Sequence, residues 1–269
     1  MIKKPNSKSR RRQSLTAVLF IGDTHVGSKW AVCPNGQSTE GIALFKKWGE
    51  MLNRVKQVIK SDNSKLILAL GGDLVEGHHH GTMGVWGNYK QQRDAAVELL
   101  LPLATIADDI IALPGTEAHA GDDGENDRQV AQELGARIIS PRHRLLIDGK
   151  RLDWTHHGIA VSQNGWMDDG GMIQAIRRVE NASFYQHTPP PDLIVSHHAH
   201  RSPPPVYVRG VGAAVCGCWQ LSTPHGSKIA ARSNTDIGVL YWRTDETLPE
   251  RWLYNDEEKW QTLSDRRSK

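Results

Sequence analysis

The sequence predicts an α/β fold in which a largely parallel sheet is covered by helices on its faces. Short apolar runs alternate with amphipathic stretches from residue 15 to residue 135. Each apolar run is closed by glycine, or by proline and glycine, which interrupt strands. Strands that alternate with helices in this way build parallel sheets. A chain of 269 residues can bury one substantial core, so we expect one domain.

Three strand–helix pairs make up the first half of the chain. The expected strands are residues 15–22, 66–70 and 110–113. All three are predominantly apolar, as strands buried on both faces are. Residues 42–60 place large apolar side chains at three- and four-residue steps, which predicts an amphipathic helix, and residues 92–107 predict a second one. We expect a third helix to begin with a capping box of Asp122 and Glu125 and to end at Gly135.

Short strands dominate the second half, with one helix expected at residues 172–185. The expected strands are residues 145–147, 152–155, 193–195, 206–208, 212–216 and 237–242. Proline clusters within this half mark turns rather than a domain boundary. We therefore expect a single domain over residues 15–255, a tail at residues 1–14 and a polar tail at residues 256–269.

Basic residues are concentrated at the N-terminus. They are Lys3, Lys4, Lys8, Arg10, Arg11 and Arg12, with no acid among residues 1–13. Such a tail cannot bury apolar surface, so we expect it to be disordered. Its charge could contact nucleic-acid phosphates, and an equally weighted alternative is a solubilising leader.

The three cysteines and the absence of long apolar runs indicate the compartment. Three cysteines are too few for a disulfide framework, which favours a reducing setting. No apolar run approaches the about 20 residues that a spanning helix needs, and the basic start lacks the apolar core of a signal peptide. We expect a cytoplasmic protein without a membrane span. The sequence does not indicate an oligomeric state.

Residue types that bind metals follow five of the expected strands. The segments are Gly22-Asp23-Thr24-His25, Gly72-Asp73-Leu74-Val75-Glu76, Gly115-Thr116-Glu117-Ala118-His119, Thr155-His156-His157-Gly158 and Ser196-His197-His198-Ala199-His200. Alternate residues leaving a strand point the same way, so Asp23 and His25 can converge on one ion. Ligand sites of α/β sheets lie at these strand ends. Imidazole and carboxylate ligands without thiolate suit manganese, iron or zinc.

The order of these motifs resembles the calcineurin-like metallophosphoesterase family over residues 15–242. The resemblance implies two packed mixed β-sheets flanked by helices, a four-layer sandwich, with a dinuclear metal centre at the strand ends. It implies that Asp23, His25 and His200 hold one metal and that His157 and His198 hold the other. Asp73 would bridge the pair. Two divalent ions about 3.5–4 Å apart can clamp a phosphate and activate a water; we expect Mn²⁺, with iron or zinc as alternatives.

The sequence departs from the family after the third strand, where the usual Gly-Asn-His becomes Gly115-Thr116-Glu117-Ala118-His119. The asparagine that ligates the second metal is missing. We expect Glu117 to replace it, with the weaker hydroxyl of Thr116 as the alternative. His119 is the candidate general acid that protonates the leaving alkoxide.

Three further residues and one run of histidines near the centre have open roles. His156 precedes His157 and is the alternative ligand, because neighbouring residues of a strand face opposite ways. His197 stands where the family commonly has glycine and is expected to support a ligand rather than bind metal. Glu76 is expected to support a ligand or to contact the substrate. The run His78-His79-His80 is expected to be a polar loop rather than a third metal site.

These features favour a metal-dependent phosphoesterase, and we expect a phosphodiesterase or nuclease acting on DNA or RNA. The basic tail and three aromatic residues of glycine-rich loops, Trp86, Tyr89 and Trp166, support this substrate, because aromatic rings stack on bases. The alternative role of these aromatic residues is ordinary loop anchoring.

Two other functions stay open. A phosphomonoesterase acting on proteins or nucleotides could use Arg93, Arg177 and Arg178 for the extra phosphate charge, although all three could equally be solvated helix residues. A non-catalytic metal-binding scaffold is supported only by the missing asparagine. A full set of buried polar ligands has no obvious structural use, which speaks against the scaffold.

Overall fold

The computed structural model describes residues 15–34, 38–78, 84–161, 168–223 and 235–255. The expected tails at residues 1–14 and 256–269 lie outside this part of the chain, so both stay predictions. His79, His80 and Trp166 also lie outside the described residues.

The larger sheet has six strands in the order β11-β10-β1-β2-β3-β4. Its strands are β1 (Thr16–Ile21), β2 (Lys65–Leu70), β3 (Asp109–Ala112), β4 (Ile138–Ile139), β10 (Gly238–Arg243) and β11 (Glu250–Leu253). Strands β1 to β4 pair in parallel, whereas β10 joins β1 and β11 joins β10 in antiparallel fashion. The sheet is therefore mixed, with a parallel part built from the first half of the chain.

The smaller sheet has five strands in the order β5-β6-β7-β9-β8. Its strands are β5 (Arg142–Ile147), β6 (Lys150–Thr155), β7 (Leu193–Ser196), β8 (Val206–Val208) and β9 (Val211–Val215). The three central strands are parallel, and both edge strands are antiparallel.

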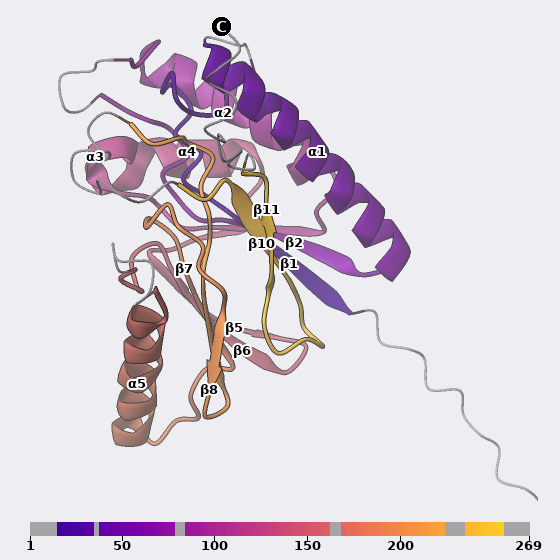
Figure 1. Cartoon of the computed structure of the whole chain (residues 1–269), viewed down its shortest axis with the longest axis vertical. Helices are drawn as coiled ribbons and strands as arrows, with labels where there is room; N and C mark the ends of the chain where they lie inside the picture. The colour runs from indigo at the N-terminus through magenta and orange to yellow at the C-terminus, as the bar shows by residue number, and fades with distance from the viewer. Residues whose placement is uncertain (1–14, 35–37, 79–83, 162–167, 224–234, 256–269) are drawn as a thin grey trace, which may run out of the picture.

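The two sheets pack face to face and are covered by helices on their outer faces (Figure 1). The helices are α1 (Thr39–Asp62), α2 (Tyr89–Ala104), α4 (Glu125–Glu133) and α5 (Asp168–Gln186). Side chains alternate along β1: Leu19 and Ile21 pack with α1, α2 and α4, while Val18 and Phe20 enter the core between the sheets. Phe20 meets Trp154 of β6 there, with ring centroids 5.8 Å apart.

Helix α5 covers the other outer face, where Ile176 packs with Val211 and Val215 of β9. The order of layers is thus helix, sheet, sheet, helix, and the predicted fold class of two packed mixed sheets flanked by helices is confirmed. None of the described helices combines the length and apolar character needed to cross a membrane.

The predicted capping box at Asp122 is wrong. Residues Asp122–Gly124 form a single 3-10 turn, and α4 begins after Gly124 without a side-chain cap. Asp123 has a left-handed backbone (φ 53°), which separates the turn from the helix. The predicted end of this helix at Gly135 is confirmed, because α4 stops just before this glycine, which has a left-handed backbone (φ 84°). A capping box does occur at α2, where Asn88 and Gln91 bond each other's backbone.

Candidate metal centre

The candidate ligands lie on loops that leave the carboxyl ends of β1, β2, β3, β6 and β7. Asp23 and His25 follow β1, and their backbone amides donate to Gly72 and Asp73 at 2.8 and 3.0 Å. Because these bonds extend the parallel pairing of β1 and β2 beyond the strands, the two loops are held side by side.

Left-handed backbone turns the ligand side chains back over the sheet edge. The residues with this conformation are Asp23 (φ 49°), His25 (φ 45°), Asp73 (φ 49°), His198 (φ 70°) and His200 (φ 54°). Few non-glycine residues adopt it, and aspartate and histidine are among those that tolerate it best. The side chains expected to bind metal thus sit on sharply bent loops.

Asp23, His25 and His200 form the first group of possible ligands. The Nε2 atoms of His25 and His200 are 3.0 Å apart, and the Nε2 of His200 is 3.5 Å from Asp23 Oδ1. Asp23 and His25 are buried. Burial alone would raise the pKa of Asp23, but the neighbouring imidazoles of His197 and His200 hold it well below its usual range. This carboxylate is therefore ionised.

Asp73 lies between this group and the remaining histidines. It forms one group with His25 and His119 and another with Asp23 and His156. His156 Nε2 is 3.2 Å from Asp73 Oδ2. Although burial opposes ionisation, His156 and His198 keep the pKa of Asp73 well below its usual range. The position suits the expected bridging role.

His156 and His157 both reach the second side of the centre, together with His198. The buried His156 donates from Nδ1 to the carbonyl of Gly71 at 2.6 Å, so its Nε2 faces Asp73. A ligand histidine is commonly fixed by such a bond. Burial lowers the pKa of His156, but the two aspartates outweigh this and raise it to about 9. His157 is exposed, and its ring centroid lies 3.9 Å from that of His198.

Thr116, rather than Glu117, lies against Asp73. The backbone amide and hydroxyl of Thr116 donate to Asp73 Oδ1 at 2.6 and 3.0 Å. Glu117 is exposed at the start of the one-turn helix α3 (Glu117–Ala120) and belongs to none of the groups of possible ligands among the described residues. Of the two alternatives to the missing asparagine, the structure brings Thr116 to the centre.

His119 faces His25 and Glu76. The His119 ring lies edge-on to His25, with centroids 4.3 Å apart, and its Nδ1 donates to the Glu76 carbonyl at 2.9 Å. Glu76 Oε2 lies 2.9 Å from His25 Nδ1 and accepts from Gln220 Nε2 at 3.0 Å. Burial, with the charge of His25, lowers the pKa of His119 to about 4. Its Nε2 is thus unprotonated near neutral pH, so His119 must accept a proton before it can donate one.

His197 lies behind Asp23. It is buried, with Nδ1 3.7 Å from Asp23 Oδ2, and that oxygen also accepts from the His198 amide at 3.0 Å. A Cβ at Gly71 would come within 2.1 Å of the His197 ring, so glycine is required there. This placement fits the expected supporting role of His197.

Asp127 is a supporting residue that the sequence reading missed. It is buried on α4 and accepts from the amides of Leu74 at 3.0 Å and Gly115 at 2.9 Å. It therefore ties together the loops after β2 and β3. Burial, with the charge of Asp73, raises the pKa of Asp127 to about 7. The sequence does mark this residue: Asp127 lies on the same helix face as Val130 and Leu134, where an apolar residue is expected, so a carboxylate there indicates a buried polar contact.

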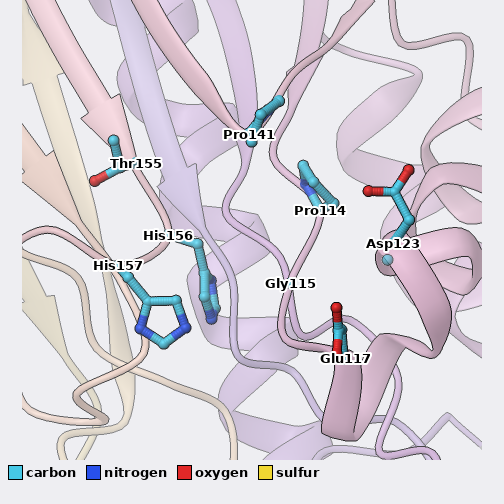
Figure 2. A pocket seen from close by; sticks show the side chains of 9 residues that line it. Pro114, Gly115, Glu117, Asp123, Pro141, Thr155, His156 and His157 are labelled. Atoms are coloured by element: carbon cyan, nitrogen blue, oxygen red, sulfur yellow. The ribbon is translucent and has the colours of Figure 1, made fainter.

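A pocket of about 270 Å³ opens beside the His156 side of the centre. Figure 2 shows His156 and His157 on one wall and Pro114, Glu117 and Asp123 on the other. Gly115, Gly124, Pro141 and Thr155 complete the lining.

No protein-family model matches the chain, and no curated protein matches it. Solved structures do show similarity. An archaeal phosphodiesterase is 10% identical over 88% of this chain and 99% of its own, with a TM-score of 0.46. Vps29 of Chaetomium thermophilum is 10% identical over 84% and 78%, with a TM-score of 0.40, and a protein of unknown function from Aquifex aeolicus is 16% identical over 73% and 82%, with a TM-score of 0.35.

Proposed function

We propose that this chain is a divergent calcineurin-like metallophosphoesterase that hydrolyses phosphoester bonds with two divalent ions. One observation carries the proposal: side chains from loops far apart in the sequence converge as overlapping groups of possible ligands around Asp73. In each group the ligand atoms lie within 4.8 Å of one another. The first ion would be held by Asp23, His25 and His200, and the second by His156 or His157 with His198.

The donor set fits divalent ions. Asp23 Oδ1 and His156 Nε2 are buried and make no directed hydrogen bond within the described part of the chain. Buried polar atoms are normally satisfied, so unsatisfied ones that face other ligand atoms support an ion as their partner. Histidine and carboxylate donors suit manganese, iron or zinc, and we propose manganese.

Bound divalent ions would supply Lewis-acid stabilisation of the phosphoryl charge and an activated water. The protein supplies the rest. Thr116 fixes the bridging carboxylate of Asp73 by two hydrogen bonds. His119 takes a proton from solvent on Nε2 and gives it to the leaving oxygen, while the Glu76 carbonyl fixes the ring through Nδ1.

A phosphodiester suits the site better than a phosphomonoester. A monoester carries more negative charge, and no lysine or arginine lines the described pocket. Of the three arginines considered for this charge, Arg93 donates to Asn126 at 2.5 Å, whereas Arg177 and Arg178 are exposed on α5. Trp86 packs on the main core, which favours loop anchoring over base stacking for that residue.

DNA or RNA as substrate is the finer part of the proposal and rests on the basic tail. Deleting residues 1–13 should reduce the dependence of DNA affinity on salt, because fewer counterions are then released. An unchanged slope would remove the tail from the proposal.

The test compares hydrolysis of bis-p-nitrophenyl phosphate and p-nitrophenyl phosphate with Mn²⁺, before and after Asp73→Asn. We expect the diester to be cleaved faster, and the variant to lose at least about 100-fold in kcat/KM. Asp122→Asn, the same change at an exposed position, is the matched control. If calorimetry shows Mn²⁺ binding but neither ester is cleaved, the scaffold function is correct. Faster cleavage of the monoester would favour a phosphomonoesterase.

A further inference from the structure

Gln220 is a buried amide next to the first group of possible ligands. Only 4% of the residue is exposed, although glutamine is mostly found at protein surfaces. Its two neighbours attach this segment to the chain that follows β1: the Trp219 amide donates to the Asp23 carbonyl at 2.9 Å, and the Leu221 amide donates to the Trp30 carbonyl at 2.8 Å. The backbone on both sides of Gln220 is therefore held beside the centre.

The side chain of Gln220 reaches His25 through Glu76. Gln220 Nε2 donates to Glu76 Oε2 at 3.0 Å, and the same oxygen lies 2.9 Å from His25 Nδ1. All three residues are buried. His25 Nδ1 makes no directed hydrogen bond within the described part of the chain, so its contact with the carboxylate is electrostatic. On the other edge of the ring, His25 Nε2 lies 3.0 Å from His200 Nε2. The ring therefore stands between the carboxylate and the second histidine of the first group.

These contacts determine which nitrogen of His25 carries the proton. The amide nitrogen of Gln220 can donate but not accept, so its hydrogen bond stabilises negative charge on Glu76 Oε2. A proton on His25 Nδ1 is attracted by this charge, whereas a bare lone pair there would be repelled at 2.9 Å. The single proton of neutral His25 is therefore kept on Nδ1, which leaves the lone pair of Nε2 bare. A histidine binds a metal ion through such a bare nitrogen.

We propose that Gln220 is a positioning residue that, through Glu76, keeps His25 in the tautomer whose Nε2 is bare and can bind the first ion. The proposal rests on the proposed function, because that function places His25 at this ion. Loss of a group that supports a ligand histidine weakens metal affinity by about 10–100-fold. Gln220 acts one contact further from the ion than Glu76 does, so its loss should weaken binding of the first ion by about 10-fold, at the lower end of this range.

The test uses Gln220→Met, which keeps the length of the side chain and removes the amide donor. NMR of the metal-free, full-length protein with ¹⁵N-labelled histidine distinguishes a protonated ring nitrogen from a bare one, and His25→Gln assigns the signals of His25. We expect the wild type to carry this proton on Nδ1 and the variant to populate both tautomers. Calorimetry should show that the variant binds the first Mn²⁺ about 10-fold more weakly. Gln129→Met, which removes an exposed amide donor 2.9 Å from Glu125 Oε1, is the matched control.

Two results would overturn the role of Gln220. One is a wild-type His25 with its proton on Nε2, which counts even if Gln220→Met fails to fold. The other is a variant that is less stable in urea but keeps the wild-type tautomer and Mn²⁺ affinity, because Gln220 would then contribute to packing alone. Neither result affects the proposed function if the wild type cleaves bis-p-nitrophenyl phosphate. If the wild type binds no Mn²⁺, the proposed function fails, and the tautomers of wild type and variant still decide whether Gln220 positions His25.

Discussion

Thr116→Val is the substitution that best separates the roles of Thr116 and Glu117. Valine keeps the shape of threonine and replaces the hydroxyl, which donates to Asp73 Oδ1 at 3.0 Å, with a methyl group. The backbone amide of residue 116 keeps its own bond to that oxygen. Although Thr116 is the N-cap of α3, its side chain makes no capping bond, so the change removes no helix cap.

The magnitude follows from the charge and burial of Asp73. A hydrogen bond to an ionised group contributes about 1.5–3 kcal/mol, and Asp73 is only 1% exposed, so water is poorly placed to replace the hydroxyl. We expect the metal-free variant to lose about 1.5–3 kcal/mol of unfolding free energy. The bridging carboxylate would also be less well oriented, and loss of such a supporting bond weakens metal binding by about 10–100-fold.

The assay is urea unfolding with EDTA, paired with calorimetric titration of Mn²⁺. Thr116→Ser keeps the hydroxyl and should therefore retain most of the unfolding free energy and most of the Mn²⁺ affinity. Glu117→Gln should leave Mn²⁺ affinity within about two-fold, since an exposed charge contributes little. The reasoning is refuted if Thr116→Val binds Mn²⁺ like the wild type while Glu117→Gln loses affinity. Glu117 would then be the replacement ligand.

Three more perturbations test the supporting structure. Asp127→Ala leaves the amides of Leu74 and Gly115 without an acceptor, so urea unfolding should show a loss of about 2–5 kcal/mol; a loss below about 0.5 kcal/mol would contradict the link between the two loops. Gly115→Ala would place a Cβ 2.2 Å from the Asp73 backbone nitrogen, so it should lower both the melting temperature and Mn²⁺ affinity, and normal values for both would show that the loops adjust freely. Since the pKa of His156 is raised to about 9, its contribution to stability is complete below about pH 6.5 and is lost as the pH rises through 9. The metal-free protein should therefore lose up to about 3 kcal/mol over this range, His156→Asn should flatten the loss, and a wild-type profile without it would contradict the raised pKa.

Much of the fold was predictable because its strands are continuous apolar runs. Strands buried on both faces, such as β1 and β2, have no polar alternation, and each ends at glycine, so both were located within about one residue of their bounds. Strands β4 and β11 were not predicted. The former has two residues, and the latter mixes charged and apolar side chains at a sheet edge. The capping box at Asp122 failed because a neighbouring left-handed residue ends the turn before the helix begins.

Site residues that directly follow a strand could be predicted from the sequence. Site residues whose role depends on tertiary contacts could not. Asp23 and Asp73 directly follow buried strands, so their convergence follows from sheet geometry. Whether His156 or His157 faces the bridging aspartate depends on the bend after β6, which the residue spacing does not fix. Asp127 contributes through backbone amides of loops that are distant in sequence.

The left-handed backbone of the ligand loops lowers the stability of the metal-free protein but holds the ligand side chains in place before an ion binds. An L-residue gives up about 1–2 kcal/mol in this conformation, and aspartate or histidine occupies it at each of the five ligand positions, where glycine would relax the backbone. The cores of the two sheets hold this strain in the protein alone, before any ion arrives. Ion uptake would then be limited by the loss of water from the ion and by access to the site, with little backbone folding. A chain with glycine at these five positions would lose the backbone strain and the ligands together.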